Sequence, residues 1–510
     1  MIHLTDEQVL AAASEDRLVD IVSAPGSGKT TVAAERFGFH RYQRGDDRGV
    51  LGLTFNRAAA RELAQRVTSR WGESCLVYPH RIATFDHVYV DLIHRLIREK
   101  IISWPGSHER LDVRDDYRGL DGFTYLVPDR NWRRYASLNS KRQVVSLSRM
   151  VTKPARGVGA KAKHQSILGQ GIVDHEDVRH VLRAVLEDVD LRALISDWLS
   201  SSYRAIIIDE VYDADELDIE VARLAADSGS SVTTIGDPWQ ALYKWRGAQP
   251  HLVAKLLEAT TDRFNCRILS QSFRFHGTQM PELAAALRRG EKASLPPISS
   301  EDIDVALARR WRDLWRVGDN VLPLAFRNVE NKSDAAILLL LDVVTKSRLG
   351  ENAHGRESAI AKLKIDRDSF LQKQREIMEP LVARLMAGED AVTVLDALRD
   401  TVKSLGVRRP SRLGDPSKEA ALVEQIAQIA ARLPRTDLIP GLTVFQAKGQ
   451  EWSRVGVVLS SAQVAMLEGG LQQDFEDHCI IYVAVTRAKW LCGRLGDDRP
   501  LDLAGLEDEL

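Results

Sequence analysis

The residues most suggestive of chemistry form a glycine-rich segment, residues 23–31, which reads Ser-Ala-Pro-Gly-Ser-Gly-Lys-Thr-Thr. An apolar run typical of a buried strand precedes it, at 18–22, and a segment typical of a helix follows, at 30–42. Backbone N–H groups of such a loop and of the helix N-terminus converge on phosphates. Lys29 would neutralise the β- and γ-oxygens of a nucleotide, and Thr30 would offer its hydroxyl to Mg²⁺. We expect an ATP- or GTP-binding loop made of Ala24, Pro25, Gly26, Ser27, Gly28, Lys29, Thr30 and Thr31.

A second half-site lies far along the chain, where residues 205–210 read Ala-Ile-Ile-Ile-Asp-Glu. This pattern predicts a buried strand that ends in two carboxylates. An ATPase needs two acids at such a place, Asp209 to hold Mg²⁺ and Glu210 to orient and deprotonate the attacking water. A strand end with two solvated acids is the ordinary alternative, but the phosphate-binding loop elsewhere in the chain makes it the less favoured one.

Residues 233–248 join two kinds of chemistry within a short distance. Gln240 follows a predicted strand and can reach a γ-phosphate or the attacking water. Tyr243 and Trp245 lie two residues apart, and aromatic rings so placed can stack on unpaired bases of any identity. Core packing is the ordinary explanation for a Trp beside an Arg, so the segment alone leaves both interpretations open.

The charge of the chain is unevenly placed, although its formal total is only −2. Residues 130–163 contain basic side chains and no Asp or Glu. Such clustering is expected of a surface that tracks nucleic-acid phosphates, and a solvated basic insertion is equally compatible with it. The DNA-binding candidates in this stretch are Lys141, Arg142, Lys161 and Lys163.

The elements that must position these residues alternate along the chain. Strand-like runs occur at 18–22, 49–55, 82–85, 205–209, 232–236, 267–269, 321–325, 442–445 and 455–459. Strands separated by helical stretches predict parallel α/β sheets. Two long helical stretches, a basic one at 91–199 and one of mixed charge at 345–435, interrupt this rhythm. We therefore expect an α/β fold with two cores, the first from 1–90 and 200–266 and the second from 267–344 and 436–510.

Composition points to a reduced, cytoplasmic protein without a membrane partner. A chain of 510 residues with 44% hydrophobic content can form several domains. Its four cysteines lack the spacing of disulfide or metal frameworks. The longest aliphatic run, residues 335–341, is far too short to span a bilayer, and the N-terminus does not resemble a cleavable signal.

In their order along the chain, these segments resemble the motifs of the UvrD/Rep/PcrA family of superfamily 1 helicases. The resemblance covers the chain apart from the two long helical stretches. Residues 4–8, Leu-Thr-Asp-Glu-Gln, resemble the adenine-reading motif, in which Gln8 contacts the base. Residues 269–274 match the motif whose aromatic, Phe273, stacks on adenine and whose Arg274 meets the γ-phosphate. Residues 482–488 match the last motif, whose Arg487 is a second arginine finger.

Other segments are similar to the family's DNA-contacting motifs. Residues 54–63 and 83–85 resemble two strand-end motifs that hold single-stranded DNA, which assigns Phe55 and Thr84 to DNA. Residues 443–452 match the motif that contacts DNA and ribose. This match assigns Thr443 and Lys448 to DNA, and Glu451 to the nucleotide.

The resemblance implies two RecA-like cores with the nucleotide in the cleft between them. It implies that 91–199 is similar to accessory domain 1B, and that 345–435 is a reduced remnant of domain 2B. The implied activity is an Mg²⁺-dependent ATPase that moves 3′ to 5′ on single-stranded DNA, in DNA repair or antiphage defence. The short second insertion resembles the helicase-like subunit of Gabija-type antiphage systems, and we therefore expect a nuclease partner or self-association.

Several positions depart from the family's pattern. Tyr212 stands where Gln is usual, Phe445 where His is usual, and Asp86-His87 where His-Ser is more frequent. None of these is a predicted catalytic residue, since that set is Lys29, Asp209, Glu210, Gln240, Arg274 and Arg487. Tyr212 and Phe445 lie where the family couples ATP to DNA. An alternative therefore stays open, a nucleotide- and DNA-end-sensing regulatory ATPase subunit of a nuclease complex with little unwinding of its own.

Overall fold

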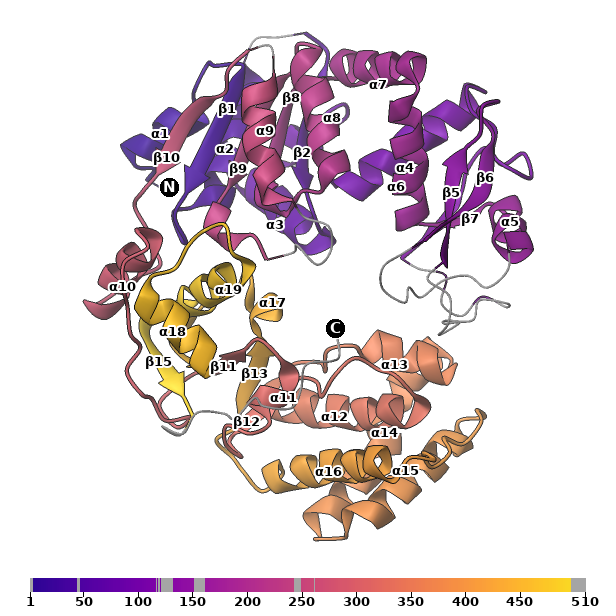
Figure 1. The fold of residues 1–510 in the computed structure, drawn as a ribbon, viewed down its shortest axis with the longest axis vertical. Helices are drawn as coiled ribbons and strands as arrows, with labels where there is room; N and C mark the ends of the chain where they lie inside the picture. The colour runs from indigo at the N-terminus through magenta and orange to yellow at the C-terminus, as the bar shows by residue number, and fades with distance from the viewer. Residues whose placement is uncertain are drawn as a thin grey trace. The chain divides into compact units, whose positions relative to one another are not determined.

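The chain divides into two compact units, Met1–Arg274 and Phe275–Leu510 (Figure 1). The structure is a computed structural model, and it describes residues 3–43, 46–115, 117, 120, 132–150, 161–242, 249–260 and 262–496. In those ranges, none of the helices is both long enough and apolar enough to cross a membrane.

The first unit is built on a six-stranded sheet in which every neighbouring pair of strands is parallel. Its strands, in spatial order, are β10 (Asn265–Leu269), β1 (Leu18–Ser23), β9 (Ser231–Gly236), β8 (Tyr203–Asp209), β2 (Gly49–Thr54) and β3 (Arg81–Thr84). The central strands are buried along nearly their whole length, as expected of a parallel sheet covered on both faces.

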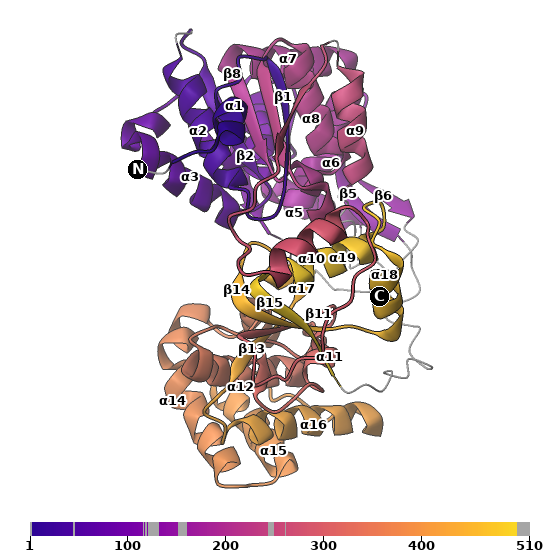
Figure 2. The same ribbon diagram turned by 90° about the vertical axis from the view of Figure 1, so that its left-hand side faces the viewer.

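Successive side chains of each strand enter two different cores, because strand side chains alternate between faces. In β8, Ala205 and Ile207 pack with one cluster, and Ile206 and Ile208 pack with the other. Figure 2 shows the helices that complete these layers on opposite sides of the sheet, with α2 and α3 on one and α8 and α9 on the other. The helices of this core are α1 (Asp6–Ala12), α2 (Lys29–Tyr42), α3 (Arg57–Trp71), α8 (Glu216–Asp227) and α9 (Pro250–Ala259), with short 3-10 turns η1 (Glu73–Leu76), η2 (Val211–Asp213) and η3 (Pro238–Gln240).

The insertion of the first unit contains both helices and strands. Its elements are α4 (Phe85–Arg98), β4 (Asp112–Arg114), β5 (Trp132–Leu138), β6 (Val144–Met150), α5 (Lys161–Gly169), β7 (Ile172–Asp174), α6 (His175–Glu187) and α7 (Val189–Ser202). The prediction of a helical insertion is therefore wrong for part of the basic stretch, which forms the antiparallel hairpin of β5 and β6.

The second unit contains a five-stranded sheet, also parallel throughout. Its strands in spatial order are β12 (Val321–Pro323), β13 (Ile439–Thr443), β11 (Val305–Ala308), β14 (Trp452–Val458) and β15 (Ala488–Leu495). The helices beside this sheet are α10 (Gln279–Arg288), α11 (Trp311–Leu314), α17 (Val444–Ala447), α18 (Ser461–Gly469) and α19 (Glu476–Val485).

The second insertion is a helical bundle around α12 (Lys332–Leu349). The other helices are α13 (Arg356–Leu363), α14 (Arg367–Met386), α15 (Ala391–Ser404) and α16 (Pro416–Arg432). Every residue of α12 from Ser333 to Thr345 is buried, because the other helices of the bundle surround this helix. Such burial explains why most of its side chains are apolar on all sides. The aliphatic run at 335–341 thus lies at the centre of the core of this bundle.

The predicted fold class, two parallel-sheet α/β cores with insertions, is confirmed. One expected boundary is wrong. The sequence pattern places 267–269 in the second core, but β10 pairs with β1 in the first sheet, and the first unit continues to Arg274. Strands β11 and β15 were not predicted.

Candidate functional site

The candidate nucleotide residues follow four adjacent strands of the first sheet. The loop at 24–28 follows β1, Glu210 follows β8, Gln240 follows β9, and Arg274 follows β10. The strand ends are level, since Val22 pairs with Gly236 and Asp209 pairs with Ile235. The carboxyl ends of parallel strands share one edge of the sheet, which is where open α/β sheets bind ligands.

The loop after β1 needs its glycines for both backbone shape and space. Gly26 has a φ of +71° and Gly28, the N-cap of α2, has a φ of +81°. A Cβ on Gly26 would lie 2.4 Å from the Cβ of Arg274, and one on Gly28 would lie 2.7 Å from Nε2 of Gln8. Ser27 is 1% exposed, and its hydroxyl lacks a hydrogen-bond partner among the residues that the structure describes. A close-fitting loop with an unsatisfied donor at a helix N-terminus suits a phosphate.

Helix α1 braces this loop from one side. Nε2 of Gln8 donates a hydrogen bond to the carbonyl of Ser27 (2.9 Å). Oε1 of the same side chain accepts from the backbone N–H of Thr5 (3.0 Å), which completes a capping box at the start of α1. The predicted base-contacting residue therefore lies directly beside the phosphate-binding loop.

The segment after β10 braces the loop from the other side. Ser272 Oγ donates to the carbonyl of Pro25 (2.6 Å), and the N–H of Phe273 donates to the carbonyl of Gly26 (2.9 Å). Phe273 is 49% exposed, so its ring is accessible to a base. The structure thus brings the predicted aromatic and Arg274 to the loop.

The two predicted acids lie at the end of β8, next to α2. Nζ of Lys29 is 3.6 Å from Oε1 of Glu210, which has a left-handed backbone (φ +60°). Asp209 is buried, and it accepts hydrogen bonds from the Glu210 N–H (3.0 Å) and the Thr30 hydroxyl. Burial and the neighbouring Glu210 carboxylate raise the pKa of Asp209 to about 7, against the opposing effect of Lys29.

A divalent cation would favour the ionised form of Asp209, and the hydroxyl of Thr30 lies beside that carboxylate. In the described parts of the chain, His, Cys, Asp and Glu side chains do not form a group of three that could hold a metal ion by themselves. This donor set fits Mg²⁺, which keeps water and phosphate ligands and takes only one or two carboxylates from a protein.

Gln240 is held in place by a residue that sequence reasoning missed. Its Nε2 donates to Oδ2 of Asp237 (2.8 Å), while Oδ1 of Asp237 accepts from the Trp239 N–H (3.2 Å). An Asp followed by Pro is a typical start of a helical turn, so this signal was present in the sequence. The predicted DNA-stacking residues Tyr243 and Trp245 lie outside the described residues.

Two predicted DNA residues of the first unit, Phe55 and Thr84, lie at the same edge of the sheet. They lie at the ends of β2, which neighbours β8, and of β3, which neighbours β2. Thr84 ends β3 and caps α4, since its hydroxyl accepts from the His87 N–H (3.2 Å). Phe55 follows β2, and its ring centroid is 5.0 Å from that of Phe85. The DNA and nucleotide candidates of this unit therefore follow six neighbouring strands.

The candidates of the second unit flank β13, β14 and β15. Thr443 ends β13, and its buried hydroxyl lacks a hydrogen-bond partner among the described residues. Lys448 ends α17 as its C-cap. Glu451 precedes β14 and pairs with Lys489 (2.8 Å), while Arg487 precedes β15 and donates to the carbonyls of Val483 (3.2 Å) and Gln450 (3.3 Å).

The basic candidates of the first insertion differ from one another. Lys141 and Lys163 are exposed, whereas the guanidinium of Arg142 pairs with Asp188 (3.0 Å) and Asp190 (3.2 Å). Lys161 begins α5, and its side chain is outside the described set. The expectation of four equivalent phosphate-binding cations therefore needs correction at Arg142, whose charge is already compensated.

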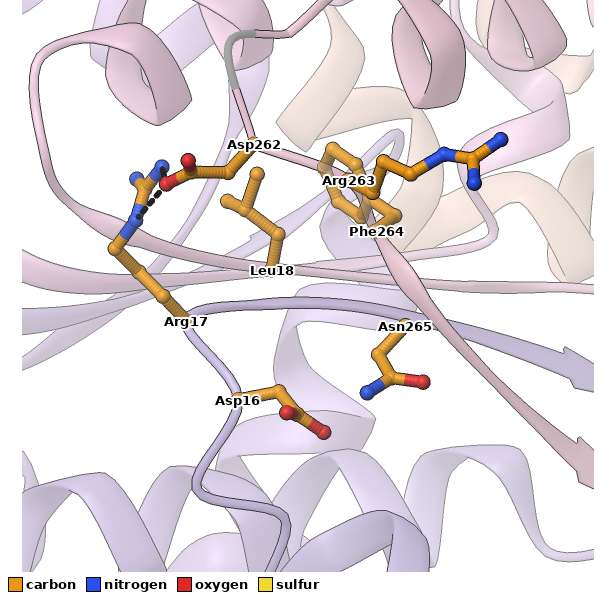
Figure 3. A pocket seen from close by; sticks show the side chains of 7 residues that line it. All are labelled: Asp16, Arg17, Leu18, Asp262, Arg263, Phe264 and Asn265. Atoms are coloured by element: carbon orange, nitrogen blue, oxygen red, sulfur yellow. Dashed lines mark hydrogen bonds and ion pairs between the residues drawn. The ribbon is translucent and has the colours of Figure 1, made fainter.

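A pocket of about 460 Å³ lies at the amino ends of β1 and β10 (Figure 3). Its lining residues are Asp16, Arg17, Leu18, Asp262, Arg263, Phe264 and Asn265. Nε of Arg17 donates to Oδ2 of Asp262 (3.1 Å) across it. The amino ends are the sheet edge opposite to the candidate residues, so this pocket is separate from the candidate site.

Comparison with known proteins adds a family. Residues 4–118 and 132–261 match the family described as UvrD/REP helicase N-terminal domain. The match covers the strands β1, β2, β3, β8 and β9 with the residues that follow them, and it ends before β10.

Curated relatives of low identity agree with that match. The chain is 20% identical to a probable DNA helicase II homolog of Mycoplasma capricolum over 287 residues, which are 53% of this chain and 39% of the relative. It is 23% identical to DNA helicase II of Escherichia coli over 274 residues, 50% of this chain and 36% of that protein. It is 19% identical to the ATP-dependent DNA helicase PcrA of Bacillus subtilis over 345 residues, 64% of this chain and 43% of that protein. The aligned region spans less than half the length of each of these relatives.

Proposed function

Because the chain belongs to the UvrD-like family of superfamily 1 helicases, we propose that it is a DNA-stimulated ATPase and DNA helicase. In this proposal it moves 3′ to 5′ on single-stranded DNA in DNA repair or antiphage defence. One observation carries the proposal: the loop after β1, the acids after β8, Gln240 after β9 and Arg274 after β10 share one edge of a parallel sheet.

The chain's own residues can perform each part of ATP hydrolysis. Bound MgATP would supply the γ-phosphoryl group and neutralise part of its charge. Nζ of Lys29 lies 3.6 Å from Oε1 of Glu210, and it would leave this contact to bind the phosphates. Glu210 would then accept the proton of the attacking water. Gln240, fixed by Asp237, would orient that water.

Arginines would stabilise the charge that develops during the reaction. We assign this role to Arg274, which lies beside Gly26, and to Arg487, which occupies the matching position of the family's last motif. Glu451 would contact the nucleotide, as the resemblance implies.

DNA would bind along Phe55, which follows β2, and Thr84, which ends β3. Thr443 and Lys448 would contribute from the second unit, and the unsatisfied hydroxyl of Thr443 supports its role as a donor to a phosphate. The position of Phe55 after β2, the strand next to the acid-bearing β8, supports stimulation of the ATPase by DNA.

The decisive experiment measures ATP hydrolysis with and without oligo-dT, and unwinding of duplexes with a 3′ or a 5′ single-stranded tail. We expect DNA to raise the turnover rate and the 3′-tailed duplex to be the substrate. Lys29→Ala is the matched inactive control. ATP hydrolysis that ignores DNA, or unwinding only of the 5′-tailed duplex, would contradict the proposal.

We also propose that a second copy or a nuclease subunit assists unwinding. The bundle of the second insertion is small, with one core around α12. Unwinding also needs a surface that holds the duplex against the two α/β cores, and a tethered partner can supply that surface. Light scattering during unwinding tests this idea, and processive unwinding by a demonstrated monomer would rule it out.

A further inference from the structure

A largely buried guanidinium joins three helices of the first unit. Nε of Arg179, on α6, donates to Oδ1 of Asp86 on α4 (2.7 Å). Its Nη1 donates to Oδ2 of Asp215 (2.9 Å) and Oδ1 of Asp218 (3.1 Å), both at the start of α8. The side chain of Arg179 is only 19% exposed, so these contacts form with little water around them.

The other charged and polar groups of the cluster approach from the same three helices. Arg183 of α6 donates to Oδ2 of Asp215 (2.8 Å), and the hydroxyl of Tyr89 of α4 donates to Oδ1 of Asp218 (2.6 Å). Arg179 alone contacts both Asp86 and the acids of α8 in these interactions. Arg179 therefore bridges the Asp86 carboxylate and the acids of α8, beside the direct contact that Tyr89 makes between α4 and α8.

One end of the bridge lies at the DNA candidates. Thr84 is the N-cap of α4, and Asp86 lies in the first turn of that helix. A DNA phosphate bound by Thr84 would approach the N-terminus of α4 and raise the negative potential at the Asp86 carboxylate. The phosphate would repel the Asp86 carboxylate and add its own attraction for the guanidinium of Arg179, so the balance of forces on Arg179 would change.

The other end lies at the turn that holds Glu210. Asp215 caps α8 and directly follows the turn at 210–214. Within this turn, the Asp213 N–H donates to the Glu210 carbonyl (2.9 Å) and the Ala214 N–H donates to the Val211 carbonyl (3.1 Å). A displacement of Asp215 therefore acts on the backbone of Glu210.

We propose that Arg179 is a positioning residue, which makes ATP turnover respond to DNA by linking Asp86 to the turn that carries Glu210. This inference rests on the proposed DNA-stimulated ATPase. A planar guanidinium is required, because its nitrogens bond two acceptors at once in different directions, whereas an ammonium is a compact point charge. Among the residues that the structure describes, Arg179 contacts neither the nucleotide candidates nor the predicted DNA residues, so it would act through its partners.

The experiment compares basal ATPase, DNA-stimulated ATPase and oligo-dT affinity in Asp86→Asn, Arg179→Lys and Arg179→Met. We expect the ratio of stimulated to basal kcat to fall at least about fivefold in each variant. Basal kcat, the KM for ATP and the Kd for oligo-dT should stay within about twofold of the parent values. Arg183→Met is the matched control, since it removes a cation from Asp215 without a link to Asp86, and it should keep the parent ratio.

Several outcomes would overturn the proposal. Asp86→Asn is the mildest change, so an unchanged ratio in this folded variant would overturn the bridge even if Arg179→Met fails to fold. Equal loss of basal and stimulated rates would show a purely structural role. A parent protein whose ATPase ignores DNA would overturn the proposed function together with this inference, whereas the first two outcomes leave the proposed function intact.

Discussion

In the first sheet the candidate residues follow the strands, whereas in the second sheet two of them precede the strands. Glu210 comes directly after β8, but Glu451 comes before β14 and Arg487 before β15, whose first residues Trp452 and Ala488 are paired. The rule that ligands meet the carboxyl ends of parallel strands agrees with the loop, the two acids and Gln240, which the pattern alone predicted, whereas Arg274, Phe55 and Thr84 came from the family resemblance. The second set required the resemblance to a family.

The strongest test of this contrast is the general base of the first sheet. Glu210→Gln should reduce ATP turnover by a factor on the order of 10² or more and leave nucleotide binding intact, since only proton acceptance is removed. Steady-state hydrolysis and a fluorescent-nucleotide titration measure the two quantities. Glu216→Gln, an exposed acid nearby on α8, is the control. Hydrolysis at the parent rate would remove Glu210 from its role.

A second test concerns the residue that precedes β15. Arg487→Ala should lower kcat by roughly 10- to 100-fold with a smaller change in KM, because a finger acts on charge that develops in the transition state. The exposed Arg454 of β14 provides the control variant Arg454→Ala. An increase in KM alone would make Arg487 a binding residue and would weaken the contrast between the sheets.

The acid at the end of β8 predicts a pH dependence. The pKa of Asp209 is raised to about 7, so below that pH a cation must displace a proton from the carboxyl group. The Mg²⁺ concentration needed for nucleotide binding should therefore fall roughly tenfold from pH 6 to pH 8. A Mg²⁺ titration of the free nucleotide corrects for protonation of its phosphates. If the corrected Mg²⁺ concentration needed for nucleotide binding did not change with pH, Asp209 would be ionised over the whole pH range.

The close approach of the β10 segment to the loop can be tested by stability. Gly26→Ala should reduce the free energy of unfolding by about 1–3 kcal/mol, because it adds a clash with Arg274 to the strain of a positive φ. Gly229→Ala introduces a positive-φ alanine without a neighbour within 4 Å, and it should cost only about 1 kcal/mol. Urea denaturation measures both free energies of unfolding. Equal decreases in the two variants would show that the segment after β10 moves away from the added methyl group at little cost.

The smallest expected effect distinguishes two neighbouring cations. Lys141→Ala should reduce the slope of log affinity against log salt by about 0.7 for single-stranded DNA, as for one lost phosphate contact. Arg142→Ala should leave the slope unchanged, because Asp188 and Asp190 already compensate its charge. Equal effects would mean that these ion pairs open when DNA binds.

Local patterns predicted the elements that carry their own signals. The loop at 24–28 is a single continuous segment, and so is the strand that ends at Asp209. Both lie where the sequence pattern predicts them. Strand pairing is different, because the partner of a strand is set by distant residues. Asn265 pairs with Val19, and no local feature of residues 265–269 indicates that contact. The error in the core boundary follows from this.

Side-chain partners were the least predictable part of the site. Arg142 looked like a free cation in the sequence, but its acceptor Asp188 is contributed by the start of α7. Asp86 was noted only as a departure from a family pattern, and its partner Arg179 lies 93 residues away. Sequence patterns identify chemical groups, whereas compensation of their charges depends on tertiary contacts.

The brace formed by Gln8 limits how this chain could change over evolution. One amide closes the first turn of α1 and holds the Ser27 carbonyl, and the resemblance assigns nucleobase selection to the same residue. A mutation that altered base preference would therefore also loosen the loop and the helix. Selection of another nucleotide would then require a compensating change elsewhere in the chain. We therefore expect a preference for adenine to persist during evolution.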